Sequence, residues 1–381
     1  MDATRKMIVI CFMAAGLAMV GCTLARTTGP TLTPAQTLTI TIPPTQTITS
    51  IPSDTPTITP RPTPYGGATG KLLVLSGGSL SLFDVGTGAS SQLMNSVSDF
   101  AWSPDGRQIA VIGQSGTLPQ GLYLISPDDG STSPVVARTD VNSIVWSPDS
   151  AILAFQLSHA KNYFFQQDIT LFYLDKANLL TLLTRTAENH FTQISVSSYI
   201  FSPDESRIFF AATIGSMKRS GIYEIVTRFG TTPAPLAEIK SEFVTNLRLS
   251  PDGKKLAFIN CDEENIYMLD LASHSVSKLT DLPPEQSSLC FMPFEWSPDG
   301  NSIVFLRSGT IYRINSDGTN IVTLMNDVLP VSTLTFSPDG KLITFTSYEN
   351  NKVGIYTMNA DGTNKTRLTD GDFAKWQPIL K

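Results

Sequence analysis

One short motif recurs along this chain and constrains its fold more than any other feature. It consists of an aromatic residue or leucine, then Ser-Pro-Asp, and then glycine in most copies. The six copies begin at Trp102, Trp146, Phe201, Leu249, Trp296 and Phe336. A period of roughly 40 to 55 residues is typical of a repeat architecture. Between the motifs lie short runs rich in β-branched and aromatic residues, which predict β-strands. Repeats of this length that consist only of strands predict the blades of a β-propeller.

The unit that begins at Trp296 shows the order of elements within one blade. The aromatic residue ends an inner strand, the Ser-Pro-Asp-Gly turn follows, and three further strands are predicted over 303–306, 311–314 and 321–324. Proline fixes φ at the first corner of the turn, aspartate accepts a backbone hydrogen bond, and glycine tolerates a positive φ. Because Ser150 and Glu205 replace the glycine in two copies, we expect those turns to be looser or differently shaped.

The aromatic residues of the inner strands are predicted to pack between neighbouring blades, because a sheet must bury one face against its neighbour. We expect this structural role, rather than an aromatic binding site, for Trp102, Trp146, Phe201, Trp296, Phe336 and Trp376.

The two ends of the repeat region predict how the ring closes. Three strands, over 71–76, 80–84 and 91–94, precede the first motif without an inner strand of their own. The segment 373–378 supplies that missing inner strand, and joining it to the first three removes exposed sheet edges. We therefore predict that residues 69–381 form an all-β, seven-bladed β-propeller of four-stranded antiparallel blades, six complete and one shared between the termini.

The N-terminal segment predicts export. Arg5 and Lys6 precede an apolar run over 7–20, which is too short for an ordinary membrane span but has the length of a secretory signal's apolar core. Met19-Val20-Gly21-Cys22 resembles the lipobox of bacterial lipoproteins, in which cleavage precedes the cysteine and its sulfur carries diacylglycerol. The resemblance implies a signal peptide over 1–21 and lipid attachment at Cys22. An uncleaved N-terminal anchor or a plain secretion signal is the alternative.

Residues 22–68 are predicted to be a disordered linker. They are dominated by Thr and Pro and carry very few charges, so they have too little apolar surface to offset the entropy of ordering the chain. We expect an exported domain tethered to the cell membrane or the outer membrane, with the acyl chains as its membrane contact.

The repeat itself resembles that of a known family. The aromatic-Ser-Pro-Asp-Gly motif, the strands of Ile-Ala-Phe and Ile-Tyr type, and the Asp-Gly-Thr-Asn turns at 317–320 and 361–364 are similar to the WD-like repeat of TolB-type β-propellers. The resemblance implies the fold but not the activity. Such propellers occur in the periplasmic TolB protein, as the gating domain of prolyl oligopeptidases and in surface proteins of unknown role. TolB carries an α/β domain where this chain has a lipobox and linker, and the Gly-x-Ser-x-Gly elbow of a hydrolase domain is absent here.

Length variation between the repeats points to one face of the disc. Strands alternate direction within a blade, so the links after the second and fourth strands share one face, the loop-rich face, and the turns after the first and third strands share the other, the turn face. Insertions fall on the loop-rich face at 158–167, 188–193, 214–219 and 283–294. Variable loops on a rigid scaffold usually carry binding sites, although insertions tolerated without a function are the alternative. The predicted binding residues are His159, Lys161, Tyr163, Phe164, Phe165, His190, Phe191, Lys218, Arg219 and Phe291.

The cysteines point to the same face. Cys261 ends the second strand of one blade and Cys290 precedes the first strand of the next. Both are expected to emerge on the loop-rich face, where an exported protein permits oxidation. We predict a disulfide between them; two separate thiols are the alternative.

Charge and residue content narrow the function. A net charge of -6 and a pI near 5.1 argue against nucleic acid as a partner. His274 is expected on the turn face, away from His159 and His190, so no metal site is predicted. No cofactor is predicted either, and we expect a monomer.

The resulting hypothesis is a binding or scaffold module for an envelope protein or polymer. No Ser-His-Asp grouping can be assigned, so no catalytic residue is predicted. The alternative is a lyase or glycoside hydrolase acting on polysaccharide from a central pocket of the loop-rich face, for which Glu263, Glu264 and Glu285 are nearby carboxylates. A structural subunit of an envelope complex is a third class.

Overall fold

The computed structural model describes one unit of the chain, the β-rich part within Arg61–Lys381. The described residues are 70–114, 116, 118–161, 164–182, 194–214, 219–228, 231–283, 292–326, 328, 333–349 and 351–379. Every regular element among them is a β-strand, which confirms the all-β class. None of these residues forms a helix that is long and apolar enough to cross a membrane. The predicted signal peptide (1–21) and the whole of the predicted linker (22–68) lie outside the described residues, so both stay predictions.

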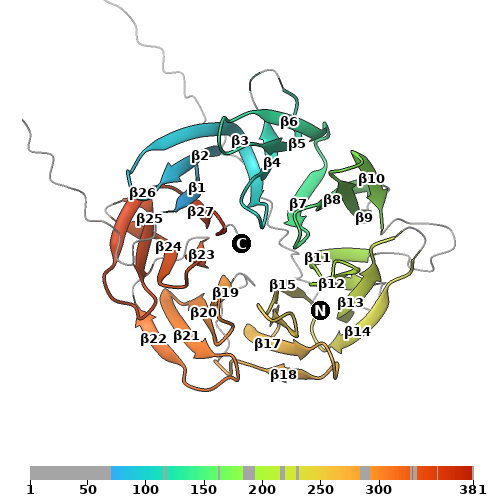
Figure 1. Ribbon diagram of the computed structural model, residues 1–381. Helices are drawn as coiled ribbons and strands as arrows, with labels where there is room; N and C mark the ends of the chain where they lie inside the picture. Colours follow the sequence, from blue (N-terminus) through green and yellow to red (C-terminus); the bar gives the residue numbers. More distant parts are fainter. Residues whose placement is uncertain are drawn as a thin grey trace, which may run out of the picture. The chain divides into compact units, whose positions relative to one another are not determined.

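Five separate four-stranded antiparallel sheets follow one another around the ring (Figure 1). The first contains β7 (Val141–Trp146), β8 (Ile152–Lys161), β9 (Phe164–Tyr173) and β10 (Asn178–Thr181). The second contains β11 (Ile194–Phe201), β12 (Arg207–Ile214), β13 (Arg219–Val226) and β14 (Ala234–Ile239), and the third contains β15 (Val244–Leu249), β16 (Lys255–Asn260), β17 (Asn265–Asp270) and β18 (Val276–Lys278). The fourth contains β19 (Phe294–Trp296), β20 (Ser302–Arg307), β21 (Thr310–Asn315) and β22 (Val322–Met325), and the fifth contains β23 (Leu334–Phe336), β24 (Leu342–Glu349), β25 (Lys352–Asn359) and β26 (Thr366–Asp370).

The remaining strands form one seven-stranded sheet in the order β27-β1-β2-β3-β4-β5-β6. Its strands are β1 (Lys71–Ser76), β2 (Ser79–Asp84), β3 (Ser90–Trp102), β4 (Ile109–Gln114), β5 (Gly121–Ile125), β6 (Thr132–Val136) and β27 (Phe373–Trp376).

The prediction of seven separate blades is therefore wrong: the described residues form five separate blades and one larger sheet. The cause is β3, a single strand of 13 residues where two strands and a link were expected. Its first part pairs with β2, up to Met94 opposite Leu80, and its second part pairs with β4, from Asn95 opposite Gln114. The irregular pairing after Asn95 and the positive φ of Ser96 let the strand bend from one half of the sheet to the other.

Closure of the ring by the two ends of the repeat region is confirmed. Strand β27 pairs antiparallel with β1, and Leu72 lies opposite Trp376 as predicted. Side chains of the C-terminal segment also hold the neighbouring half of the sheet. Lys375 Nζ donates to Phe100 O at 2.8 Å, and Gln377 Nε2 donates to Gly106 O at 2.9 Å.

Apolar side chains fill the spaces between neighbouring sheets. Ile169 of β9 shares a buried cluster with Phe210 of β12 in the next sheet. The two halves of the seven-stranded sheet likewise enclose a cluster that contains Leu80 and Val111. The core is thus a ring of clusters between sheets, which matches the packing of propeller blades.

The predicted role of the inner-strand aromatics is confirmed. Trp102, Trp146, Phe201, Trp296, Phe336 and Trp376 are all buried. Three of the tryptophans also donate Nε1–H to a backbone carbonyl of the preceding inner strand. These bonds join Trp102 to Lys375 at 3.3 Å, Trp146 to Ala101 at 3.2 Å and Trp296 to Arg248 at 3.3 Å.

The six Ser-Pro-Asp turns share one geometry, so the expectation of different turns at Ser150 and Glu205 is wrong. In every copy the serine hydroxyl donates to the aspartate at 2.5–2.6 Å and accepts the backbone N–H five residues later at 2.8–3.1 Å. The fourth residue has φ between 60° and 72° whether or not it is glycine. Ser150 Oγ and Glu205 Oε1 instead accept the backbone N–H of Asp105 and Asp149 in the preceding turns, at 3.0 and 2.8 Å, and thereby join neighbouring sheets.

Replacing the tryptophan of the closing strand is expected to destabilise the ring. Trp376→Ala leaves a cavity between sheets and should lower the free energy of unfolding in urea by about 3–5 kcal/mol. Trp376→Phe keeps a ring but leaves the buried Thr344 Oγ1 without the 2.8 Å hydrogen bond from Trp376 Nε1, so we expect a loss of about 1–3 kcal/mol. The exposed Ile379→Ala is the control, expected to change stability by less than about 0.5 kcal/mol. An unchanged urea midpoint for Trp376→Ala would contradict the closure.

The turns also predict a loss of stability in acid. The hydrogen bond from the turn serine is the main reason that the pKa values of Asp204, Asp252 and Asp299 lie below the ordinary value. Carboxyl groups with a lower pKa in the folded state stabilise the fold above their unfolded pKa of about 3.9, and this stabilisation is lost as pH falls through the folded values.

Ser250→Ala should return the pKa of Asp252 toward the ordinary value. The variant should therefore be less stable than the natural protein at neutral pH, and this difference should narrow as pH falls below about 3.9. NMR titration of the carboxyl carbons would measure the pKa, and melting temperatures between pH 6 and 2 would measure the stability. Ser273→Ala is the matched control, because Ser273 donates to Asp270 in a different turn and should leave Asp252 unchanged. A pKa of Asp252 that is equal in Ser250→Ala and the natural protein would refute this account.

Candidate functional site

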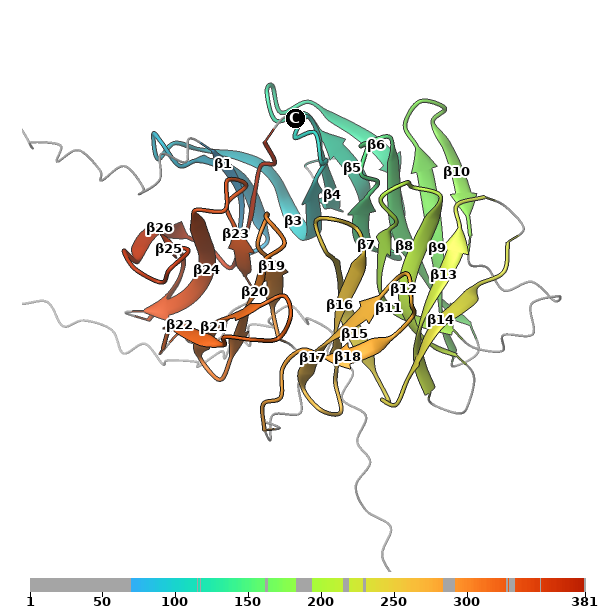
Figure 2. The same ribbon diagram turned by 60° about the horizontal axis from the view of Figure 1, so that its bottom comes forward.

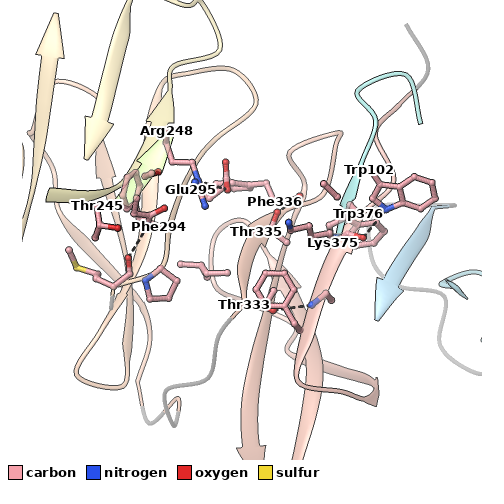
Figure 3. A pocket seen from close by; sticks show the side chains of 18 of the residues that line it. Trp102, Thr245, Arg248, Phe294, Glu295, Thr333, Thr335, Phe336, Lys375 and Trp376 are labelled. Atoms are coloured by element: carbon pink, nitrogen blue, oxygen red, sulfur yellow. Dashed lines mark hydrogen bonds and ion pairs between the residues drawn. The ribbon is translucent and has the colours of Figure 1, made fainter. Parts of the chain in front are cut away.

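A cavity of about 710 Å³ lies in the middle of the ring of inner strands. Its wall comes from β3, β11, β15, β19, β23 and β27, together with residues next to them (Figure 3). The volume falls within the range of ~300–1,000 Å³ known for ligand pockets. The cavity therefore has the size of a ligand-binding site.

The residue just before each inner-strand aromatic or leucine occupies an equivalent place on its strand, and these residues divide the ring into two arcs. On β3, β7 and β11 this residue is Ala101, Val145 or Ile200. On β15, β19, β23 and β27 it is Arg248, Glu295, Thr335 or Lys375, and all four line the cavity. We call these four residues the polar arc. They are consecutive around the ring, so charge and hydrogen-bonding groups are concentrated on one side of it.

Arg248 and Glu295 form a loose ion pair in the polar arc. Arg248 Nε lies 3.6 Å from Glu295 Oε2, and the two side chains are 41% and 33% exposed (Figure 3). Arg248 Nη1 also donates to Leu247 O at 3.1 Å. Burial raises the pKa of Glu295, and the positive charge of Arg248 opposes this rise. The pair is thus partly open to water and faces the cavity.

Lys375 is more tightly engaged. In addition to its hydrogen bond with Phe100 O, its ammonium group lies 5.4 Å from the ring centre of Phe100 and 5.5 Å from that of Phe373. Burial lowers the pKa of Lys375, and the negative charge of Asp99 opposes this effect. Lys375 therefore serves ring closure as well as lining the cavity.

Other polar side chains of the inner strands join each strand to the next. Asp99 Oδ2, Ser198 Oγ and Thr333 Oγ1 each accept a backbone N–H of the following inner strand, from Ile144, Leu247 and Ala374 respectively, at 3.0 Å. Burial raises the pKa of Asp99, while Lys375 and the accepted N–H groups oppose the rise. These side chains hold the cavity wall together. Arg248, Glu295 and Thr335 differ from them, because within the described part of the chain none of these three side chains accepts a backbone N–H of the next inner strand, and Arg248 and Glu295 meet only through their loose ion pair.

The loop-rich face differs from its predicted form. Residues expected in an inserted loop extend β8 and β9 into a hairpin, with His159 opposite Gln166, Ala160 opposite Phe165 and Lys161 opposite Phe164. Figure 2 shows these strands beside the long strands β12 and β13 of the next sheet. Arg219 begins β13 opposite Ile214. The backbone of these residues is thus held by sheet pairing, and their side chains lie outside the described part of the chain.

Several predicted binding residues are not described at all. Tyr163, His190, Phe191, Lys218 and Phe291 lie outside the described residues, as do Cys22 and Glu285. Their predicted roles stay predictions.

Cys261 is disulfide-bonded and lies in the turn between β16 and β17. Its predicted partner, Cys290, lies outside the described residues, so the pairing itself stays a prediction. The chain before Cys290 is anchored nearby. The buried Arg307 donates through Nη1 to Glu264 O at 2.7 Å and through Nη2 to Pro283 O, and Asn265 Nδ2 donates to Leu282 O at 3.0 Å.

The carboxylates considered for catalysis on this face have structural partners. Glu263 pairs with Lys278 at 3.0 Å and Glu264 with Arg307 at 3.9 Å. Glu263 and Lys278 line a second cavity of about 390 Å³, where Asp281 also contacts Lys278 at 2.6 Å. Within the described ranges, no group of three or more His, Cys, Asp or Glu side chains is placed to hold a metal ion. His274 lies in the turn between β17 and β18, on the turn face as expected.

The polar arc was not anticipated from the sequence, although the sequence contains a signal for it. Alignment of the repeats on their Ser-Pro dipeptides places Arg248, Glu295 and Thr335 where the first three repeats carry Ala, Val and Ile. Residues on an edge strand that lines a central channel alternate between the core and the channel, so this single column of the repeat identifies the cavity wall.

Comparison with known proteins agrees with this fold. Residues 195–380 match the family model described as the TolB beta propeller domain. A curated protein of Bacillus subtilis (strain 168), the uncharacterized peptidase YuxL, is 29% identical over 172 residues, which make up 43% of this chain. The match covers only 25% of that relative's length.

Similar solved structures carry different names. TolB from Acinetobacter baumannii has a TM-score of 0.49 at 17% identity, over 81% of this chain and 67% of that one. Oligogalacturonate lyase from Vibrio parahaemolyticus has a TM-score of 0.56 at 14% identity, over 73% and 82%. A functionally unknown protein from Desulfotomaculum acetoxidans has a TM-score of 0.57 at 12% identity, over 81% and 99%. At such identities a shared architecture does not transfer an activity. The repeat motif, the ring of antiparallel blades and the family match agree: this chain is a TolB-type β-propeller, and its residues 195–380 belong to the TolB β-propeller domain family.

Proposed function

We propose that this protein is a lipid-anchored, extracytoplasmic binding module that captures an envelope protein or polymer through its loop-rich face and central cavity. The observation that carries the proposal is the cavity with its polar arc, held rigid by hydrogen bonds between inner strands. A pre-formed cavity with a few fixed polar groups needs little ordering when a ligand binds.

The proposed attachment places this site at a distance from the membrane. Acyl chains on Cys22 would hold the chain at the bilayer, and the linker of residues 22–68 would span on the order of 100 Å if fully extended at about 3 Å per residue. Tethering raises the effective concentration of the propeller near partners in the envelope.

One observation favours an enzyme as the second candidate. Burial raises the pKa of Glu295 and lowers that of Lys375 in the same cavity wall, and paired shifts of this kind occur in acid–base catalysis. Against it, the Lys375 ammonium group is already bound to Phe100 O, and Glu295 faces Arg248 rather than a second carboxylate. We therefore place binding first. Release of reducing ends from envelope polysaccharide by the natural protein, and its loss in Glu295→Gln, would reverse this order.

Capture of a partner should depend on the loop-rich face. We expect the triple variant Tyr163→Ala, Phe165→Ala, His190→Ala to retain about tenfold less partner from a detergent-solubilised native envelope, a loss of about 1.4 kcal/mol. The control triple variant Val276→Ala, Ile321→Ala, Ile379→Ala removes exposed apolar side chains on an outer strand and the turn face, and should capture as the natural protein does. Quantitative mass spectrometry of the bound fraction measures both. Equal capture by the two triple variants would overturn the proposed surface.

Membrane attachment is expected to require Cys22. Cys22→Ser removes the sulfur that would carry diacylglycerol, so the protein should move from the membrane pellet to the soluble fraction after cell lysis, and labelling with a radioactive fatty acid should be lost. Continued sedimentation of Cys22→Ser with washed membranes would exclude the lipid anchor and favour an uncleaved N-terminal segment.

A further inference from the structure

We propose that the central cavity binds a neutral, hydroxyl-rich ligand of the saccharide class on the Arg248–Glu295 pair. The inference deepens the proposed function, because it assumes that this cavity is a binding site, and it names the chemistry that the site would recognise.

Most polar groups of the cavity are already engaged by other parts of the protein. Thr333 and Ser198 accept backbone N–H groups of the next inner strand, as described above. Asn246 Nδ2 donates to Met292 O, next to the following inner strand, at 3.3 Å. Lys375 Nζ donates to Phe100 O and lies over the rings of Phe100 and Phe373, so its ammonium group is committed to the closure of the ring. The Arg248 guanidinium makes one hydrogen bond, to the carbonyl of its neighbour Leu247, and the described residues leave its other N–H groups for a ligand.

Glu295 has similar free capacity. Its separation of 3.6 Å from Arg248 Nε is too long for a hydrogen bond between the two side chains. A ligand in the cavity therefore meets donors on Arg248 and acceptors on Glu295 side by side (Figure 3).

The charges of the cavity wall favour an uncharged ligand. Arg248 and Lys375 are balanced by Glu295 and Asp99, so these four inner-strand groups sum to zero when all are ionised. An anion would compete with Glu295 for Arg248, and a cation would compete with Arg248 for Glu295. Breaking a partly buried ion pair leaves one charge without its partner, which is costly. Two neighbouring hydroxyl groups instead accept from Arg248 and donate to Glu295 without separating the pair.

The rest of the cavity wall combines hydroxyl groups with apolar surface. Thr335 and Thr245 add hydroxyl groups near the pair, while Ala101, Phe373 and Pro293 present apolar surface elsewhere in the cavity. A sugar ring matches this division, because its hydroxyl edge is polar and its C–H faces are apolar. The combination of a neutral pair, hydroxyls and apolar wall fits a saccharide better than a peptide terminus or a phosphate.

The test separates ligands by charge. Polysaccharides from the protein's own cells are partly hydrolysed with acid, and anion exchange divides the oligosaccharides into a neutral and an anionic fraction. The full-length protein, in a detergent without a sugar headgroup, is then examined with each fraction by saturation-transfer difference NMR and by retention on immobilised protein.

We expect the neutral fraction to bind, and both Arg248→Met and Glu295→Gln to weaken its retention about tenfold. The matched control is Arg207→Met, which removes an ion pair with Glu224 of 2.8 Å outside the cavity and should leave retention unchanged. Melting curves establish that each variant is folded. If Arg248→Met does not fold, Glu295→Gln alone carries the test, because it removes the charge and keeps the shape of the side chain.

Three results would overturn the inference: stronger binding of the anionic fraction, neutral binding that is equal in the cavity variants and the natural protein, and binding of neither fraction. Protein capture from the envelope is measured on the same preparations. A captured protein partner without any bound saccharide would leave the proposed function standing and refute this inference alone.

Discussion

The pairing of β27 with β1 is the interaction on which the rest of this structure depends. Without it, the sheet that begins with β1 and the sheet that ends with β26 would both face an open gap, and unpaired strand edges favour association with other chains. With it, each inner strand has a fixed neighbour on both sides of the ring. The cavity exists because the inner strands are held at these positions, so closure at the chain ends determines the shape of a site whose other residues come from the middle of the chain.

The inner strands combine two roles within a few residues. The aromatic positions alternate with positions that face the ring centre, so the same short strand packs the core and lines the cavity. Among the centre-facing residues, Asp99, Ser198 and Thr333 bind backbone N–H groups of the next strand and are explained by the architecture. Arg248 and Glu295 have no such role. The contrast matters because any polar residue in a channel wall can be mistaken for part of a binding site. Its hydrogen-bond partners show whether it holds neighbouring strands together or is available to a ligand.

Much of this fold could be predicted from the sequence, because the repeated motif carries its own turn chemistry and its own core residue. The motif aromatics, the four-stranded blades and the meeting of Leu72 with Trp376 were predicted for that reason. The continuous β3 was not, since Asn95 and Ser96 are typical of a link. The strand runs through them although its pairing with β4 is interrupted between Asn95 and Asp99, where Val97 N–H instead donates to Gly78 O at 2.9 Å. The turn at Glu205 was mispredicted for a similar reason. Its positive φ is unusual for a residue with a side chain, and Glu205 accepts a hydrogen bond from Asp149 of the preceding turn, a contact that the sequence does not reveal.

The candidate site was less accessible to prediction. Variation in loop length drew attention to residues such as His159 and Lys161, whose backbone belongs to a paired hairpin. Finding the polar arc requires a different comparison. The position just before each inner-strand aromatic or leucine has the same place in every repeat, but its residue changes from apolar to polar. Which of several polar residues is free depends on partners from other strands, and the sequence alone does not contain those contacts.

The placement of β1 has a mechanical consequence for the point at which the chain enters the ring. The chain enters the ring at Gly70 and continues directly into β1, a strand with neighbours along both of its edges, β2 and β27. A load applied at Gly70 along the direction of β1 therefore acts parallel to two ladders of hydrogen bonds at once, so that many bonds resist together rather than opening one after another. The seam where the two ends of the ring meet is therefore expected to resist such a load as a unit.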